Sequence, residues 1–479
     1  MDIHLVLYDN LNIQVNTNSK EYLDALQDHL TEYKKGFRFM PKYKRGGWDG
    51  KISVFKKQTR TFPYGLLFDV IRFTKTSFPD LKLVVSQDVK NLFKGISPKD
   101  NDYTLSLYPY DYQKDCVDIL LRSSKGIVVV ATAGGKSLII SYIVDIINKY
   151  ITDNKSLIIV PTKQLVQQFK GDMCGYGMKS HIGIVDADHK EFNNQIVIST
   201  WQSLQNQMDK LNTFNTVIVD EVHTARADVL SEILRNCINA KFRYGVTGTL
   251  PMDRLEKLNV LSYLGPVFRE YTGKVLADLG YVSKCVIKQI YINYNNTYTG
   301  DYNTVKSEVF FNQYRLGLIR HIVESHNNSI LILVDKVEKE GIPLYKWLSK
   351  TVKDKIVVFL SGKDKSDIRD EWRKTMNNEN NIICIATYQI FQQGVNIPSL
   401  RTIILASSTK SYIRVIQSLG RILRKHVSKN LGGAEMYDIC DNVKFLKKHA
   451  ANRNKYYVKE KHDILEFTLN ESDGVYEYE

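Results

Sequence analysis

A glycine-rich stretch that ends in a lysine and a hydroxyl residue lies between an apolar run and a helical segment. It reads Ala131-Thr132-Ala133-Gly134-Gly135-Lys136-Ser137. In such a strand-to-helix turn, backbone N–H groups and the start of the helix can bind phosphate oxygens. Lys136 would reach the β- and γ-phosphates of a nucleotide, and Ser137 would hold Mg²⁺. Because Val130 stands where the usual G-x-x-x-x-G-K-[ST] pattern has its first glycine, a chance Gly-Gly-Lys turn is the alternative.

An acidic pair follows another apolar run further along the chain. Val217–Val219 precede Asp220 and Glu221. A carboxylate at the carboxyl end of a parallel strand faces the crevice where ligands bind. Asp220 could complete a Mg²⁺ shell, and Glu221 could orient and deprotonate an attacking water. One acidic pair alone is often a solvated loop, but its position after a lysine loop favours ATP hydrolysis.

Two arginines near the carboxyl end of the chain could stabilise a phosphoryl group during transfer. They belong to the run Gln417-Ser418-Leu419-Gly420-Arg421-Ile422-Leu423-Arg424. Arg421 and Arg424 share one face of a helix because residues at this spacing are neighbours on its surface. Planar guanidinium groups suit the spread charge of the phosphoryl group, and such arginines can raise a rate about 10³–10⁵-fold. A basic surface helix is the simpler alternative.

Two series of short, β-branched apolar runs must position these groups. They are Ile127–Val130, Leu157–Val160, Ile196–Ile198 and Val217–Val219, followed by Ile330–Val334, Ile356–Leu360, Ile382–Ile385 and Thr402–Leu405. Such runs, alternating with helical segments, are typical of parallel strands buried on both faces. The sequence therefore predicts an α/β fold with two parallel sheets, joined near Gly273–Val282. With the lysine loop on one sheet and the arginines on the other, ATP would close a cleft and hydrolysis would release it.

Residues 1–100 have the character of a separate module. Ile3, Leu5 and Leu7 alternate with their neighbours as in a strand. Ten basic residues and one acid, Asp49, lie between positions 34 and 60, and five aromatic residues are interleaved. These are Lys34, Lys35, Arg38, Lys42, Lys44, Arg45, Lys51, Lys56, Lys57 and Arg60, with Phe37, Phe39, Tyr43, Trp48 and Phe55. Basic groups neutralise phosphates and aromatic rings stack on bases, so a DNA-contacting accessory domain is expected. A solvated basic face over core aromatics is the alternative.

Composition and charge narrow the class of partner. The net charge of +14 favours a polyanion as the binding partner. Nucleic acid is favoured over lipid because no apolar run approaches the roughly 18–20 residues of a membrane span. A start without signal-peptide features predicts a cytoplasmic protein. Six well-separated cysteines without metal spacing predict reduced thiols. No dimerisation heptad is visible, which favours a monomer.

Taken in order, these motifs resemble those of superfamily 2 helicases, and the chain is similar overall to the UvsW-type recombination helicases of tailed bacteriophages. The likeness extends to the first hundred residues, with Trp48-Asp49-Gly50 and Phe62-Pro63-Tyr64-Gly65. It implies two tandem RecA-like lobes with a small α+β accessory domain. We expect an accessory domain at 1–100, an ATP-binding lobe at 101–272 and a second lobe at 273–462. Residues 463–479 would be an acidic tail, either mobile or docked through Leu465, Phe467, Leu469 and Tyr476.

The resemblance also implies roles for further residues. Gln113, after Tyr112, would read the adenine base, and Gly394 would contact the nucleotide. Gln417 would act with Arg421 and Arg424. Thr247-Gly248-Thr249 stands where such enzymes couple hydrolysis to domain movement. The residues expected to touch nucleic acid are Pro161, Thr162, Ser199, Thr200, Trp201, Gln202, Ser361, Gly362 and Thr387, together with Lys42, Lys44, Arg45 and Trp48 of the accessory domain.

For the whole protein the resemblance implies ATP- and Mg²⁺-dependent remodelling of DNA. The substrates would be forks, four-way junctions, single strands to be reannealed and R-loops containing RNA, in recombination, repair and replication. Contacts to phosphates do not read sequence, so binding should be selective for structure and should weaken steeply with salt.

Three other interpretations fit part of these features. An RNA helicase would carry the same motifs, and only the basic module favours DNA. A passive strand-annealing or junction-binding protein would need an inactive nucleotide site, against which Lys136, Asp220 and Glu221 argue. A fused nuclease would use Pro79-Asp80 and Asp88-x-Lys90, but these lie too close together for such a site.

Overall fold

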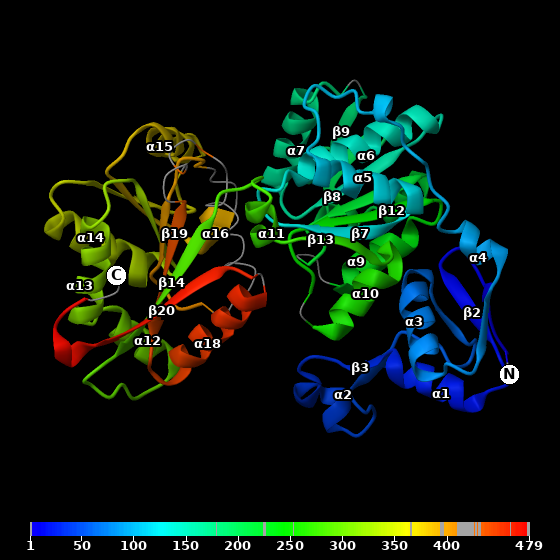
Figure 1. The fold of residues 1–479 in the computed structure, drawn as a ribbon, viewed down its shortest axis with the longest axis horizontal. Helices are drawn as coiled ribbons and strands as arrows, with labels where there is room; N and C mark the ends of the chain where they lie inside the picture. Colours follow the sequence, from blue (N-terminus) through cyan, green and yellow to red (C-terminus); the bar gives the residue numbers. More distant parts are fainter. Residues whose placement is uncertain are drawn as a thin grey trace. The chain divides into compact units, whose positions relative to one another are not determined.

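The computed structural model describes residues 2–178, 180–223, 227–251, 253–364, 366–392, 397–409, 426, 429, 433–459 and 461–476. The chain divides into two compact units (Figure 1). The first comprises Met1–Val130 and Gly135–Glu270, and the second comprises Ala131–Gly134 and Tyr271–Glu479. None of the described helices is both long and apolar enough to cross a bilayer.

The amino-terminal module is a small α+β domain. Its elements are β1 (Asp2–Leu7), β2 (Asn12–Asn16), α1 (Lys20–His29), β3 (Thr31–Tyr33), η1 (Phe37–Phe39), α2 (Pro41–Lys44), β4 (Lys51–Ser53), β5 (Thr61–Pro63), η2 (Tyr64–Leu66), α3 (Leu67–Ser77), β6 (Lys82–Val85), α4 (Gln87–Asn91) and η3 (Asp100–Asp102). Four strands form a sheet in the order β5-β2-β1-β6, and β3 pairs separately with β4. Ile3 and Leu5 are buried and alternate with exposed residues, so β1 covers its core with one face.

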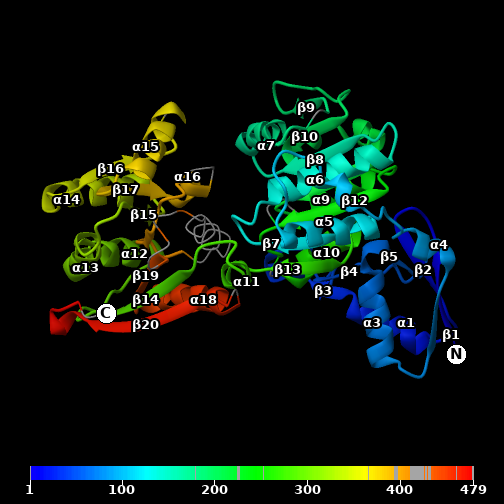
Figure 2. The same cartoon turned by 45° about the horizontal axis from the view of Figure 1, so that its top comes forward.

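The first α/β domain has a seven-stranded sheet in the order β13-β7-β12-β11-β8-β10-β9. Its elements are α5 (Asp111–Ser123), β7 (Lys125–Val130), α6 (Lys136–Tyr150), β8 (Ser156–Val160), α7 (Lys163–Gly175), β9 (Ile182–Val185), β10 (Ile196–Thr200), α8 (Trp201–Leu204), η4 (Met208–Thr213), β11 (Thr216–Asp220), α9 (Ala227–Asn236), β12 (Phe242–Thr247), α10 (Arg254–Leu264) and β13 (Val267–Tyr271). Every pairing from β7 across to β9 is parallel. Helices α5, α6 and α7 lie on one face and α9 and α10 on the other (Figures 1 and 2), so the central strands are buried on both faces.

The second unit contains another seven-stranded sheet, in the order β16-β17-β15-β18-β19-β14-β20, with only parallel pairings. Its described elements are α11 (Gly273–Asp278), β14 (Cys285–Asn293), α12 (Tyr302–Phe310), α13 (Gln313–Glu324), β15 (Ile330–Val334), η5 (Val337–Gly341), α14 (Ile342–Thr351), β16 (Ile356–Leu360), α15 (Ser366–Asn378), β17 (Ile382–Thr387), α16 (Tyr388–Gln392), β18 (Thr402–Leu405), β19 (Ala434–Asp441), α18 (Lys444–Lys459), β20 (Asp463–Asn470) and η7 (Glu471–Asp473). The predicted fold class, two parallel-sheet lobes with a small accessory domain, is confirmed.

The acidic carboxyl-terminal segment is docked in its described part, which was one of the two arrangements expected for it. Residues 463–470 form the edge strand β20 beside β14. Leu469 is buried, and the Tyr476 ring packs on Tyr314 with centroids 4.9 Å apart. Phe467, Leu469 and Tyr476 therefore anchor this segment despite its negative charge, whereas Leu465, which was expected to dock as well, is 47% exposed. The name of tail does not suit residues 463–470.

The amino-terminal module packs against α10 of the first α/β domain. Leu258 joins the buried core of the module, and the Tyr64 hydroxyl donates to the Tyr263 carbonyl oxygen. Arg254 bonds to Glu32 at 2.8 Å and to the His29 carbonyl oxygen at 2.9 Å. Buried and polar contacts together make the module a part of the first unit.

A buried lysine lies in the same packing. Tyr64 is fully buried, and the Lys125 ammonium lies 5.1 Å from its ring centroid. Burial lowers the pKa of Lys125 to about 7, and the Lys241 carbonyl oxygen accepts its hydrogen bond at 2.8 Å. Separation of the module would take the Tyr64 ring away from this amine but leave its bond to Lys241, because Lys125 and Lys241 both belong to the first α/β domain. Because the module packs on this domain, the basic residues of α2 and Lys136 belong to the same compact unit.

Gly65 is the point of closest backbone approach in this packing. A Cβ atom there would lie 1.9 Å from the Leu261 carbonyl oxygen, and backbone cannot yield as a flexible side chain can. We expect Gly65→Ala to lower the free energy of unfolding of the first unit by about 1–3 kcal/mol, the usual cost of overpacking. Thermal or urea unfolding followed by circular dichroism measures the change.

Gly171→Ala is the matched control. Gly171 lies inside α7, and its Cβ would meet nothing within 4 Å. Alanine should therefore stabilise the helix by about 0.5–1 kcal/mol. Equal effects of the two substitutions would contradict the close approach at Gly65.

Candidate nucleotide site and nucleic-acid contacts

The lysine loop begins where the buried strand β7 ends. Helix α6 starts at Lys136, and its N-cap Gly135 has the left-handed φ of 69°. Ala133 is left-handed as well, with φ 74°, a conformation that costs a non-glycine residue about 1 kcal/mol or more. The turn thus leaves the first N–H groups of α6 free to point beyond the carboxyl end of β7. An anion bound there would be stabilised by the helix dipole.

Lys136 and Glu221 form an ion pair at the carboxyl ends of β7 and β11. Lys136 Nζ lies 3.1 Å from Glu221 Oε1, and each side chain is only 12% exposed. The ammonium also lies 3.5 Å from the Val130 carbonyl oxygen. Two residues that are far apart in the chain are therefore brought together by the order of the strands.

Glu221 is held by the residues after β12. Its Oε2 accepts hydrogen bonds from the Gly248 N–H at 2.9 Å and from Thr247 Oγ1 at 3.1 Å. His223 Nδ1 lies 3.1 Å from both Thr247 Oγ1 and the Thr249 carbonyl oxygen. The stretch Thr247-Gly248-Thr249 thus contacts the candidate catalytic carboxylate directly.

The two neighbouring carboxylates differ in their protonation behaviour. Burial, reinforced by the charge of Glu221, raises the pKa of Asp220. Burial opposes ionisation of Glu221 as well, but the Lys136 ammonium and His223 outweigh it and lower the pKa of Glu221. Environments that push two adjacent pKa values apart are typical of sites where acid and base roles are divided.

The residues present fit a nucleotide with Mg²⁺. Asp220 is 5% exposed, and its Oδ1 has no hydrogen-bond partner among the described residues. A buried carboxylate oxygen of this kind is suited to a hard cation. The Ser137 hydroxyl, the other predicted ligand, lies 3.0 Å from the Tyr176 hydroxyl.

Gln113, the residue predicted to read the base, lies beside the lysine loop. A Cβ on Gly135 would stand 2.3 Å from its Nε2, and the left-handed φ of 69° at Gly135 also favours glycine. Gln113 Oε1 accepts from the Tyr110 N–H at 2.9 Å at the start of α5. Its orientation is therefore fixed by the helix that carries it.

The residues predicted to touch nucleic acid in the first α/β domain differ in accessibility. Gln202 is exposed, and Pro161 and Trp201 are half-buried. Half-buried Thr162 caps α7 through the Leu165 N–H, and buried Thr200 caps α8 in the same way.

For the side chain of Ser199 the prediction needs correction. It is fully buried, and its hydroxyl donates to the Val185 carbonyl oxygen at 2.7 Å. The residue secures β10 within the sheet instead of facing a ligand. A motif match cannot distinguish these two orientations of a strand residue.

In the second unit, Thr387 ends β17 and is 6% exposed. Ser361 is also buried, while Gly362 beside it is exposed. Four predicted site residues lie outside the described residues: Gly394, Gln417, Arg421 and Arg424.

The predicted basic segment of the accessory domain projects its charges to the surface. Lys42, Lys44 and Arg45 are exposed on and after α2, and Trp48 is half-buried with its Nε1 donating to the Lys51 carbonyl oxygen. Phe39 is 80% exposed. Of the ten basic residues, Lys34 and Lys57 alone have a carboxylate partner among the described residues.

A small aromatic cluster supports this surface. Phe37 stacks on Tyr33 and meets Tyr43 edge-on, with centroids 4.8 Å apart in both pairs. Some aromatics of the segment therefore pack on one another, as the simpler alternative held, while the exposed basic groups on α2 are accessible to an anionic partner.

His223 was missed as a site residue. Its side chain is only 5% exposed and connects the acidic stretch after β11 to Thr247 and Thr249. The sequence did contain the signal, because Asp220-Glu221-Val222-His223 places an imidazole two positions after Glu221.

Three family models match successive parts of the chain. DNA helicase UvsW, N-terminal, matches residues 2–85, the model for the res subunit of type III restriction enzymes matches 106–252, and the helicase conserved C-terminal domain matches 315–426. Together with the lysine loop and acidic pair on a RecA-like sheet, they define an ATP-hydrolysing helicase of superfamily 2.

Similarity over the whole chain gives the family. The ATP-dependent DNA helicase uvsW of Enterobacteria phage T4 is 27% identical over 98% of this chain and 100% of its own length. The DNA 3'-5' translocase XPB2 of Sulfurisphaera tokodaii is 25% identical over 66% of the chain and 78% of its own length. The crystal structure of T4 UvsW shares the fold, with a TM-score of 0.51 at 23% identity, covering 98% of this chain and 100% of that one. Over its whole length the chain is thus similar to superfamily 2 helicases of the UvsW type.

Replacing Glu221 by glutamine tests the assigned chemistry. Glu221→Gln keeps the shape and the acceptor for Gly248 but removes the charge facing Lys136 and the ability to take a proton. We expect ATP turnover to fall about 10²–10⁴-fold, the range of a lost general base, while nucleotide affinity is kept or increases. Phosphate release and fluorescent-nucleotide binding measure the two effects. Unchanged turnover would remove Glu221 from the reaction.

Proposed function

We propose that this protein is an ATP-driven DNA helicase or translocase that unwinds, branch-migrates or reanneals branched DNA. The observation that carries the proposal is the convergence of Lys136, Glu221 and the unpartnered Asp220 oxygen at one edge of the first sheet. A passive annealing protein would have no use for this buried charge arrangement, which costs free energy to maintain. Likeness to the T4 helicase along its full length, accessory domain included, supports DNA as the substrate.

Each residue of the nucleotide site has a proposed task. Lys136 binds the β- and γ-phosphate oxygens of ATP, and Gln113 selects adenine. Asp220 and Ser137 hold Mg²⁺, which when bound neutralises developing charge on the phosphates. Glu221 orients the water and accepts its proton. Arg421 and Arg424, with Gln417, stabilise the phosphoryl group during transfer.

The nucleic-acid path is proposed to use two kinds of contact. Thr162, Gln202, Gly362 and Thr387 mark backbone contacts of the two lobes, which read phosphates without reading sequence. The exposed basic groups of the accessory domain add an electrostatic contact that suits the crowded phosphates of a branch point. We place the reaction in recombination, repair and replication, in a monomer acting in the cytoplasm.

One substitution with a panel of substrates separates the candidate functions. Lys136→Ala should abolish ATP turnover while leaving DNA binding intact. Turnover and unwinding are measured on single-stranded DNA, duplex, fork, four-way junction, R-loop and single-stranded RNA. Stronger activity on forks, junctions or R-loops than on plain duplex is expected. Equal stimulation by RNA would favour the RNA helicase, and full remodelling by Lys136→Ala would favour the passive protein.

The accessory-domain contact predicts a change in salt dependence. If Lys42, Lys44 and Arg45 each neutralise a phosphate, replacing all three by alanine should make the slope of log affinity against log salt shallower by about 2–3. Fluorescence anisotropy with a labelled fork between low and moderate salt measures it.

The control removes the same charge elsewhere in the same domain. Lys75, Lys82 and Lys90 are exposed on α3, β6 and α4, and their triple replacement should leave the slope almost unchanged. Equal slopes for both triple variants would show that the basic segment is a solvated face that does not bind DNA.

A further inference from the structure

Phe39 is the most exposed large apolar side chain that the structure describes. Its exposed fraction is 80%, and none of the other described residues of this kind exceeds 62%. It lies in η1, within the loop that joins β3 to β4. Single exposed apolar residues are common on protein surfaces, so the surroundings of Phe39 must decide whether its ring has a partner.

The neighbouring aromatic residues pack on one another and leave Phe39 outside. Phe37 stacks on Tyr33 and meets Tyr43 edge-on. Its ring also covers Gly50, where a Cβ would lie 2.2 Å from Phe37 Cδ2. Because a 3₁₀ helix has three residues per turn, residues two positions apart face different sides. Helix η1 therefore directs Phe37 into this cluster and Phe39 away from it.

The turn that carries Phe39 is braced by its own backbone. The Phe39 N–H donates to the Gly36 carbonyl oxygen, and the Met40 N–H donates to the Phe37 carbonyl oxygen, both at 3.0 Å. Pro41 follows as the first residue of α2, and its ring restricts the backbone at that point. A side chain on such a turn loses little further freedom on binding, which favours binding through this ring.

The loop also belongs to the unit that contains the nucleotide site. Glu32 of β3, at the root of the loop, pairs with Arg254 of α10 at 2.8 Å. Phe39 therefore projects from a loop whose root is bound to the first α/β domain.

The charged residues around Phe39 in the sequence are all basic. Residues 34–48 contain no Asp or Glu. Arg38, Lys42, Lys44 and Arg45 are exposed, and none of the four has a carboxylate partner among the described residues. Such cations attract phosphates, and an exposed ring stacks on a base whose face is open. A protein partner would call for a contiguous apolar patch instead of one ring among cations, so nucleic acid is the better match.

We propose that Phe39 stacks on the base at the branch point of branched DNA and makes the protein select forks over plain duplex. In a closed duplex every base lies between its neighbours, whereas a base at a branch point has an open face. Trp48, which was expected to contact nucleic acid, is less suited because it is half-buried and its Nε1 donates to the Lys51 carbonyl oxygen. This inference rests on the proposed function and names the residue that gives it selectivity for structure.

The first test is Phe39→Ala, which leaves the basic residues in place. Fluorescence anisotropy gives the affinity for a labelled fork. Competition by relaxed circular duplex DNA, which has no ends, gives the affinity for plain duplex. We expect fork affinity to fall at least about fivefold, the lower end of the loss for one stacked base, while duplex affinity changes less than about twofold. An unchanged fork affinity, or an equal loss on both substrates, would overturn the proposal.

Two further variants separate stacking from general apolar contact. Phe39→Tyr keeps a planar ring and should bind forks as the unsubstituted protein does. Phe39→Leu keeps much of the apolar surface but has no ring face, so it should lose fork affinity as Phe39→Ala does. Full fork affinity in Phe39→Leu would overturn stacking as the contact. Circular dichroism checks that each variant is folded, which the exposure of position 39 leads us to expect.

Tyr8→Ala is the matched control. Tyr8 is another exposed aromatic residue of the accessory domain, with an exposed fraction of 52%, and it follows β1 in a stretch without the basic cluster. Its replacement should leave fork affinity unchanged. A loss equal to that of Phe39→Ala would overturn the particular role of Phe39.

The proposed function is tested separately by Lys136→Ala. In Phe39→Ala, kcat for ATP hydrolysis at saturating single-stranded DNA should be unchanged, because Lys136 and Glu221 are intact. Normal fork affinity in Phe39→Ala together with an inactive Lys136→Ala defeats this inference alone. An unsubstituted protein without preference for forks would defeat the proposed function, and this inference with it.

Discussion

The ion pair between Lys136 and Glu221 is the contact on which the nucleotide site depends. Burying two charges costs several kcal/mol each, and here a 3.1 Å approach and the Gly248 and Thr247 donors offset that cost. Glu221 also has a left-handed φ of 51°, which a non-glycine residue adopts only when its surroundings impose it. The strand breaks there, so Asp220 and Glu221 need not point to opposite faces of the sheet. In the proposed mechanism, a phosphate oxygen that binds Lys136 would compete with Glu221 and free that carboxylate for water.

The sequence was informative where one physical signal dominated. Fully buried parallel strands such as β8 and β11 are continuous apolar runs, and both were predicted. Strand β12 was not, because Arg243 and Gly245 interrupt it; the arginine is buried only because the Leu234, Cys237 and Ala240 carbonyl oxygens accept its donors. Backbone carbonyl partners of this kind are brought to the arginine only by folding, so they leave no pattern in the local sequence.

The same limit explains the outcomes within the site. Lys136 and Asp220 could be proposed from the sequence because phosphate and metal chemistry requires these residue types at strand ends, and the structure places both residues at such ends. Ser199 was misplaced because a strand residue faces the core or a ligand according to packing that one motif does not encode. His223 was overlooked because its partners, Thr247 and Thr249, lie on a different strand and loop.

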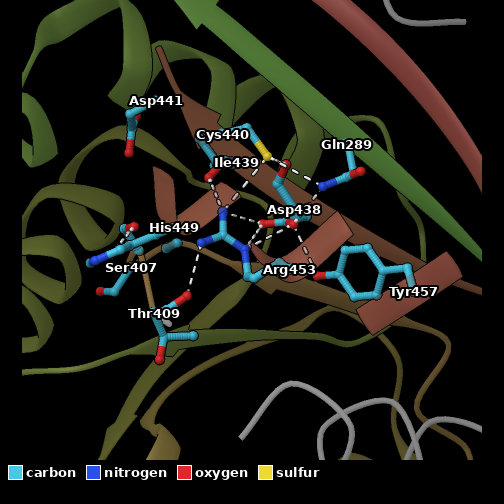
Figure 3. Close-up of polar contacts among 12 residues, drawn as sticks. Gln289, Ser407, Thr409, Asp438, Ile439, Cys440, Asp441, His449, Arg453 and Tyr457 are labelled. Atoms are coloured by element: carbon cyan, nitrogen blue, oxygen red, sulfur yellow. Dashed lines mark hydrogen bonds and ion pairs between the residues drawn. The ribbon is translucent and has the colours of Figure 1, made fainter. Parts of the chain in front are cut away.

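The two sheets use their carboxyl-end polar residues in different ways. In the first, Asp220 keeps a buried oxygen without a partner among the described residues, which leaves that oxygen open to a cation. In the second, the buried polar groups of Arg315, Tyr388 and Arg453 bind the chain's own backbone after β18. A cation can complete the first arrangement because the Asp220 oxygen still has room for a ligand. The second holds the segment after β18 at three points, one of them the contact between Arg453 and Thr409 in Figure 3, while Arg315 Nη1 has no partner among the described residues.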